Sequence, residues 1–93
     1  MIRWSDEKDQ QLRRERSVSL ETVAAMISRG EYKDVLKHPT RRNQSIFILE
    51  IAQYTWVVPF VVEEDGESIF LKTAFPSRKF HKRYGGQHEQ GEA

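Results

Sequence analysis

The sequence predicts an α+β domain in which two N-terminal helices pack on one face of an antiparallel sheet of about four or five strands, followed by a short basic helix. Two observations predict this class. Helical spacing of apolar residues is confined to the first third of the 93 residues, and the middle is rich in β-branched and aromatic residues between turn signals. A chain of this length buries one core, so we expect a single domain over residues 1–86 and a flexible polar tail over residues 87–93.

The first helix is predicted from its cap rather than from its apolar residues. Residues 2–4 alternate as a short strand does, and Ser5 or Asp6 then offers a side-chain oxygen to the free N–H groups of a helix start. The segment up to Arg16 is strongly polar, with Leu12 as its only large aliphatic residue. Such a helix is marginal in isolation, so we expect docking onto the rest of the domain to hold it.

The second helix has a clear apolar stripe. Four apolar residues share one helical face: Leu20, Val23, Ala24 and Ile27. They predict a helix over residues 20–29, with Ser19 as its N-terminal cap. Gly30 follows as the expected stop, because glycine adopts the left-handed conformation that ends many helices.

The strands are predicted from runs of β-branched and aromatic residues. Four runs qualify, at residues 32–36, 45–51, 54–62 and 68–75. Residues 52–53 form a short reversal, and residues 65–66 (Asp-Gly) are a strong hairpin signal. Pro59 lacks a backbone N–H, so its presence in the third run indicates an edge position or a bulge.

The charges are segregated although the net charge is only +1. Residues 63–67 carry four acids and no base, whereas residues 68–88 carry five bases, two histidines and no acid. A second basic run lies at residues 37–42. Segregated positive charge favours an anion-binding surface, with phosphate as the natural ligand. The alternative interpretation is a solvated face that binds nothing.

Several kinds of chemistry are not indicated. The chain has no cysteine, which excludes disulfides, thiolate metal sites and cysteine nucleophiles. Its three histidines lack ligand spacing, so we expect neither a metal nor another cofactor. There is no glycine-rich phosphate loop and no nucleophile elbow. No apolar run is long enough for a membrane span or a secretory signal, which favours a cytoplasmic protein without a membrane partner.

The candidate site residues lie mainly in the last third of the chain. On a strand, Lys72 would share a face with Phe70 and Ala74 and point to the uncovered side of the sheet. Ser77 is expected to cap a last helix that runs through Tyr84. The cationic residues of that helix would form two rows at a spacing of four: Arg78 with Lys82, and Lys79 with Arg83.

These residue types suit RNA cleavage. Arginine binds phosphate oxygens with two parallel hydrogen bonds, which suits Arg78 for charge stabilisation together with Lys72. His81 is the candidate for proton transfer, because histidine titrates near neutrality. Further candidates for substrate binding are Lys79, Lys82 and Arg83 of the same helix and Arg41 and Arg42 of the second basic run.

At this point the pattern resembles a known family, the BrnT-type toxins. Residues 4–8 (Trp-Ser-Asp-Glu-Lys) followed by residues 16–21 (Arg-Ser-Val-Ser-Leu-Glu) are similar to the opening of those proteins. Residues 76–79 (Pro-Ser-Arg-Lys) with residues 82–84 (Lys-Arg-Tyr) are similar to their terminal segment. The order of elements agrees over about residues 2–84, so the chain looks like a divergent branch of this family.

The resemblance implies a RelE-like α+β fold and a bacterial type II toxin that cleaves RNA. It also implies an antitoxin with a ribbon-helix-helix DNA-binding part, which masks the site and represses the operon, so that DNA is contacted only through the complex. By matching position, Arg78 would bind phosphate. Lys79 and Arg83 would support it, and Tyr84 would hold the terminal turn.

Two other classes of function fit the same residues. In a non-catalytic nucleic-acid-binding module, affinity falls steeply with salt while RNA stays uncut. In a partner-binding protein, an exposed sheet edge accepts an extended peptide.

Overall fold

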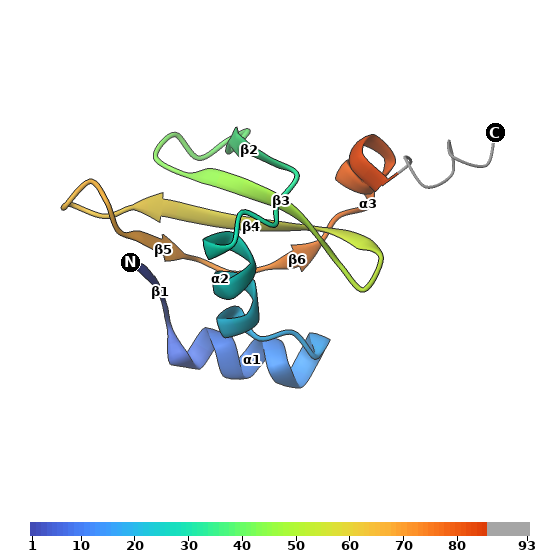
Figure 1. Ribbon diagram of the computed structural model, residues 1–93, viewed down its shortest axis with the longest axis horizontal. Coiled ribbons are helices and arrows are strands. Elements are labelled where there is room, and N and C mark those ends of the chain that lie inside the picture. Colours follow the sequence, from blue (N-terminus) through green and yellow to red (C-terminus); the bar gives the residue numbers. More distant parts are fainter. Residues whose placement is uncertain (86–93) are drawn as a thin grey trace.

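The computed structural model describes residues 1–85, and it confirms the predicted α+β class (Figure 1). The strands are β1 (Ile2–Trp4), β2 (Asp34–Lys37), β3 (Ser45–Ile51), β4 (Tyr54–Val62), β5 (Ile69–Leu71) and β6 (Phe75–Pro76). The helices are α1 (Asp6–Arg16), α2 (Leu20–Ser28) and α3 (Arg78–Phe80), and a π-helical turn, η1 (His81–Gly85), continues α3. The tail predicted over residues 87–93 lies outside the described residues.

The strands form one mixed sheet in the order β1-β5-β4-β3-β2, with β6 also paired to β4. All neighbouring pairs are antiparallel except β1 and β5, where Ile2 lies opposite Ile69 in a parallel register. The predicted purely antiparallel sheet is therefore wrong at this edge. Parallel strands need a long connection, and the chain between β1 and β5 supplies one through α1, α2 and three strands. A three-residue strand carries no sequence signal for its partner.

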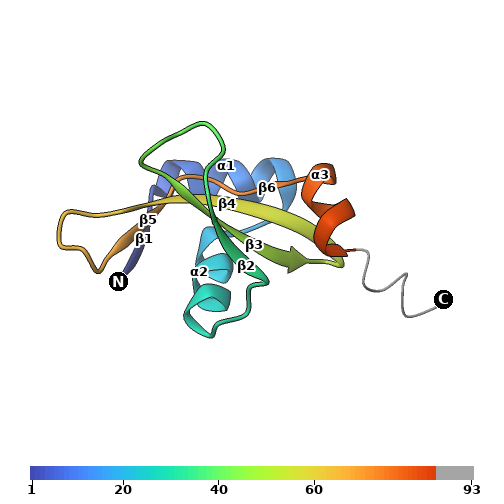
Figure 2. The ribbon, with the colours of Figure 1, turned by 90° about the horizontal axis from the view of Figure 1, so that it is seen from above.

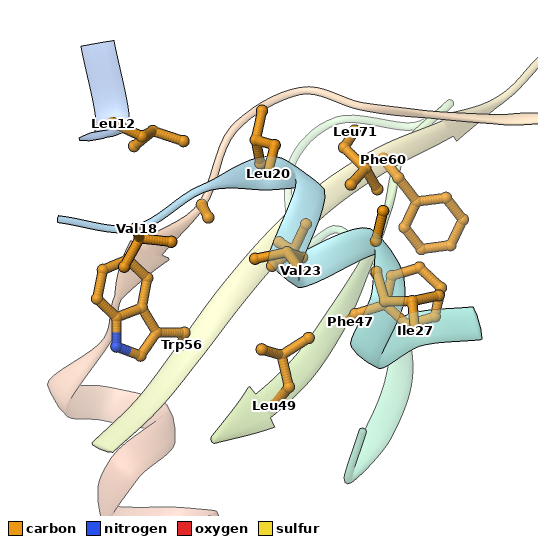
Figure 3. Packing of buried hydrophobic residues seen from close by; sticks show 13 residues of the cluster. Leu12, Val18, Leu20, Val23, Ile27, Phe47, Leu49, Trp56, Phe60 and Leu71 are labelled. Carbon is orange, nitrogen blue, oxygen red and sulfur yellow. The ribbon is translucent and has the colours of Figure 1, made fainter. Parts of the chain in front are cut away.

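The main core lies between the sheet and the two N-terminal helices (Figure 3). Helix α2 supplies Leu20, Val23 and Ile27, the stripe that its periodicity predicts. Helix α1 contributes one buried residue, Leu12, and lies on the same side of the sheet as α2 (Figure 1). The sheet side of this core comes from alternate residues of the central strands, among them Phe47, Leu49, Trp56, Val58, Phe60 and Leu71.

The helix caps form as predicted. The Ser5 and Ser19 hydroxyls each accept the backbone N–H three residues further on, at 3.2 and 3.0 Å. The Asp9 carboxylate also accepts the backbone N–H of Leu20 at 2.7 Å. This bond ties the middle of α1 to the first residue of α2, which explains how a polar helix with a single buried side chain stays docked.

Within residues 1–85, the second face of the sheet is covered at one end only. Ile46, Ile48 and Val57 form a small buried cluster there. Phe80 and Tyr84 pack on it from residues 78–85 (α3 and η1), which we call the C-terminal turn. Figure 2 shows α3 near the turn that joins β3 and β4, whereas the β2–β3 loop lies further back along the strands. The remainder of this face is left for the site described below.

The position of Pro59 differs from its prediction and has a clear cause. Strand β4 is central, because it pairs with β3 on one side and with β5 and β6 on the other. The second neighbour is interrupted between Leu71 and Phe75, opposite Pro59, so no ladder donor is missing there. Because the strand is interrupted there, Ala74 is buried in the core on the helix side of the sheet, together with Leu71. The prediction that Ala74 shares a face with Lys72 is therefore wrong.

Among residues 1–85, no helix has the length and apolar character that crossing a membrane requires.

Candidate nucleic-acid interface

A pocket of about 330 Å³ opens on the uncovered part of the second sheet face. Three segments meet around it: the β2–β3 loop, strand β4, and the chain from the break after β5 to the start of β6. The lining residues are His38, Arg41, Gln44, Pro59, Lys72, Thr73 and Phe75. The fold thus brings one cation from each basic run of the sequence, Arg41 and Lys72, to one concave surface, which we call the cationic pocket.

The strand break places Lys72 at the rim of the pocket. Its backbone N–H donates to the carbonyl of Pro59 at 2.8 Å, so the main chain stays attached to the sheet although the strand has ended. The side chain is exposed, and its Nζ lies 5.7 Å from the centroid of the Phe70 ring. A cation held beside an aromatic ring loses less freedom when it binds an anion.

The β2–β3 loop is held by its own hydrogen bonds. The His38 N–H donates to the Gln44 carbonyl at 3.0 Å, and the Gln44 N–H donates to the Arg41 carbonyl at 3.1 Å. The Nδ1 atom of His38 accepts the backbone N–H groups of Thr40 and Arg41, both at 3.1 Å. This internal bracing holds the loop backbone from which Arg41 projects.

His38 is a pocket residue that sequence reasoning did not select. The available signal is its place directly before Pro39 at the start of a loop. There a side-chain acceptor can cap the N–H groups of the next residues, as Asn and Asp commonly do. By residue type alone, His38 is a candidate only for metal binding, which its spacing does not favour. Among residues 1–85, no group of three or more His, Asp or Glu side chains is placed to hold a metal ion.

The pocket lining is positive. Arg41 and Lys72 are its charged members, and the described part of the chain contributes no carboxylate to the lining. The acidic run instead forms the β4–β5 turn, where Asp65 accepts from the Ser68 hydroxyl and from the backbone of Ser68 and Glu67. These bonds lower the pKa of Asp65 to about 2, so the carboxylate stays ionised at neutral pH. Asp65 does not line the pocket.

A larger groove of about 820 Å³ adjoins the pocket. It lies between α1 and residues 70–73, and Lys72 and Thr73 line both cavities. Its lining mixes bases with acids, including Glu7 and Glu15, so it is less suited to an anion than the cationic pocket.

The C-terminal cations are arranged differently. Arg78, Lys79, Lys82 and Arg83 are all exposed, and none of them lines either cavity. Lys79 Nζ lies 5.7 Å from the Phe80 ring, and Arg83 Cζ lies 5.5 Å from the Tyr84 ring. The π-helical turn has a wider repeat than an α-helix, so the spacing of four that predicted two cationic rows does not hold beyond residue 80. Arg42 likewise is exposed outside the pocket.

His81 is turned toward the sheet. Its Nδ1 lies 3.1 Å from the Thr55 hydroxyl, and its ring stacks on Tyr54 with centroids 4.1 Å apart. Thr55 is 1% exposed and is the one buried polar residue among the described positions. The backbone of Gly85 lies so close to this ring that a side chain at that position would collide with it. These contacts hold the C-terminal turn, and the proton-transfer role of His81 stays a prediction.

Tyr84 fixes the turn to β2. Its hydroxyl donates to Asp34 Oδ2 at 2.8 Å, and Lys33 Nζ donates to the Tyr84 carbonyl at 3.3 Å. The hydrogen bond from Tyr84, with help from the backbone N–H of Val35, holds the pKa of Asp34 below its usual value. The same bond raises the pKa of Tyr84.

No family model, curated protein or solved structure matches the chain.

Proposed function

We propose that the protein is the toxin of a bacterial type II toxin–antitoxin system, and that it binds single-stranded RNA in the cationic pocket and cleaves it without a metal. The observation that carries the proposal is the pocket itself. Arg41 and Lys72 converge there without a carboxylate, beside the exposed ring of Phe75. Cations suit the phosphate backbone and an exposed aromatic ring suits base stacking, so the combination favours an unpaired strand over a simple anion.

The proposed cleavage requires stabilisation of the negative charge that develops at one phosphodiester. The 2′-oxygen attacks the adjacent phosphorus, the bond to the 5′-oxygen breaks, and a 2′,3′-cyclic phosphate and a 5′-hydroxyl result. Water takes the 2′-hydroxyl proton and supplies the proton for the leaving oxygen. Fixed cations stabilise the extra negative charge of the pentacoordinate state more than that of the bound substrate, which is what accelerates the step. The pocket supplies Lys72 and Arg41 for this task. The resemblance to BrnT-type toxins adds Arg78, which lies outside the pocket and would act on the part of the bound strand that leaves it.

The partners follow from the same resemblance. An antitoxin with a ribbon-helix-helix part would cover the site and carry the complex to DNA, and both proteins would act in the cytoplasm. To neutralise the toxin by masking, the antitoxin must cover the surface of the toxin that binds RNA. The uncovered sheet face with its cationic pocket is the surface that fits this requirement.

Induced expression in a bacterial host tests the proposal. We expect the wild type to arrest growth and degrade RNA, and we expect Lys72→Ala and Arg41→Ala to lose both effects. Arg42→Ala is the matched control, because it removes a neighbouring arginine that does not line the pocket. Normal growth with intact RNA in cells that accumulate folded wild-type protein would contradict the toxin proposal.

One observation favours a second candidate, a module that binds RNA without cutting it. Both histidines of the described chain have Nδ1 engaged by hydrogen bonds, so neither ring offers that nitrogen as a free base. For such a module, purified protein binds RNA with an affinity that falls steeply with salt, and the RNA stays uncut. Cleavage by the purified wild type, lost in the Lys72→Ala variant, would exclude this candidate.

A further inference from the structure

We propose that His38 is a hydrogen-bond donor of fixed tautomer, which presents Nε2–H to a phosphate oxygen bound in the cationic pocket. The inference deepens the proposed function and rests on it for the identity of the phosphate as part of RNA. It assigns to His38 a role in binding and specifically not in proton transfer.

The tautomer follows from the loop hydrogen bonds. Nδ1 of His38 lies 3.1 Å from the backbone nitrogens of Thr40 and Arg41. Both nitrogens are donors only, so Nδ1 must be the acceptor and cannot carry the ring proton in this arrangement. The proton of the neutral ring is therefore on Nε2. Placing a second proton on Nδ1 would require the loop to give up both bonds.

The loop also sets the direction of the donor. The two nitrogens of an imidazole are separated by Cε1, and their N–H or lone-pair directions diverge widely in the ring plane, so Nε2–H points away from the backbone of residues 40–41. His38 lines the pocket together with Arg41, whose backbone N–H is one of the two donors that hold the ring. Lys72 lines the same pocket from the chain that follows β5. A phosphate in the pocket thus meets two cationic side chains and one neutral donor.

A neutral donor adds what the cations lack. Lysine and arginine hold an anion strongly but tolerate many orientations at long, mobile side chains, whereas the ring of His38 is fixed by two bonds to its own loop. A bound phosphodiester would then be oriented by His38 and neutralised by Arg41 and Lys72. These two are the charged side chains that share the pocket lining with His38 within the described chain.

Two substitutions separate the donor from the loop brace. In His38→Asn the side-chain oxygen occupies the position of Nδ1, so it keeps the bonds to the backbone of Thr40 and Arg41, whereas its amide nitrogen does not reach the position of Nε2. In His38→Gln the amide nitrogen reaches about as far as Nε2, so it keeps a donor but loses the brace. A purely structural role predicts that RNA affinity follows stability in both variants. A donor role predicts that His38→Asn is the more stable variant but binds RNA more weakly, whereas His38→Gln is the less stable variant but binds RNA more tightly.

The first arm of the experiment is NMR of the ¹⁵N-labelled full chain. A long-range ¹H–¹⁵N correlation spectrum reports which ring nitrogen of each histidine carries the proton, and His38→Asn assigns the signals. We expect the Nε2–H form for His38, and we expect inorganic phosphate to shift its Nε2 signal. A ring protonated at Nδ1 at neutral pH, or an Nε2 signal that phosphate does not move, overturns the inference.

The second arm measures binding of an uncleavable 2′-O-methyl oligonucleotide by fluorescence anisotropy. We expect His38→Asn to keep its melting temperature and weaken binding by about 10- to 100-fold, the usual effect of losing a hydrogen bond to a charged group. We expect His38→Gln to melt lower but bind more tightly than His38→Asn. Equal affinity of His38→Asn and wild type overturns the inference. Tight binding without cleavage by the wild type overturns the proposed ribonuclease activity instead and leaves the His38 assignment standing.

Discussion

Two regions of this molecule are rich in cations, and they are built in opposite ways. In the cationic pocket, the backbone around each cation is fixed by hydrogen bonds to the sheet or within the loop, and Arg41 and Lys72 converge from separate segments. In the C-terminal turn, the inward residues are Phe80, His81 and Tyr84, while the cations are exposed outside both cavities. Positive charge is denser along the sequence in the turn, yet it converges on a cavity only in the pocket. Density of charge and a binding site are therefore different properties.

The largest expected effect is a loss of cleavage without a loss of binding when Arg78 of the C-terminal turn is replaced. Arg78→Ala should reduce RNA cleavage by about 100-fold or more, the cost of removing one group that stabilises charge in a transition state. Binding of an uncleavable oligonucleotide should change by less than about threefold, because Arg78 lies outside the pocket and a single exposed charge contributes little. Cleavage assays and anisotropy on the same preparation check both statements.

Lys82→Ala is the matched control for Arg78, since it removes an exposed cation of the same turn. It should behave like the wild type in both assays. If Arg78→Ala retained full cleavage, the chemistry would belong to the cationic pocket alone.

Phe75 tests whether the pocket binds a base as well as a phosphate. Its ring is 37% exposed and lines the pocket. Phe75→Ala should weaken binding of a single-stranded oligonucleotide by about 5- to 100-fold, the range found when one stacked base is lost. Inorganic phosphate should still shift the pocket signals in NMR spectra of this variant. An unchanged RNA affinity would remove the argument for an unpaired strand.

His81 tests whether the C-terminal turn is held as the contacts indicate. His81→Ala removes the partner of the buried Thr55 hydroxyl and the ring stacked on Tyr54. An unsatisfied buried polar group costs about 1–3 kcal/mol. The melting temperature should therefore fall by several degrees, as measured by circular dichroism.

The double variant Thr55→Val/His81→Ala should recover part of that loss, because it leaves no unpaired hydroxyl. Oligonucleotide affinity should stay near the wild-type value in both variants. A loss of cleavage with an unchanged melting temperature would instead support the proton-transfer role predicted for His81.

The smallest effect concerns pH. The bond between Tyr84 and Asp34 lowers the pKa of Asp34, so its stabilisation is complete above the ordinary pKa of an aspartate and is lost as pH falls through the lowered value. It raises the pKa of Tyr84, so its stabilisation is complete below the ordinary pKa of a tyrosine and is lost as pH rises through the raised value. Tyr84→Phe should reduce stability between these limits and little beyond them, in denaturation curves measured across the pH range. A constant difference at every pH would contradict this role of the bond.

Much of the fold was predictable because its signals are local. The caps at Ser5, Ser19 and Ser77, and the bounds of β3 and β4, depend on residues within one turn or one strand, and they form as expected. The parallel pairing of β1 with β5 was not predictable, because a register between distant short strands leaves no pattern in either.

The candidate site likewise has a part that local sequence signals predict and a part that depends on contacts between distant segments. Lys72 and the basic run around Arg41 were visible as charges, but their convergence depends on the strand break opposite Pro59 and on a loop folded around His38. The sequence predicts a continuous strand over residues 68–75 in place of the break, because Thr73 and Phe75 are good strand formers. The role of His38 requires two backbone donors that only the folded loop presents.

The pairing of β1 with β5 also sets the order in which the chain can fold. The first strand, Ile2–Trp4, has its partner at Ile69–Leu71, and the Met1 carbonyl accepts the N–H of Ile69 at 2.9 Å. A nascent chain cannot close this edge until residues 69–71 have left the ribosome, because contacts of such long sequence separation form only when both ends are available. Lys72 follows β5 directly, so the rim of the cationic pocket is completed in the same event. Shorter translation intermediates of this protein would therefore carry the basic loop of residues 38–44 without the strand break that turns it into a pocket.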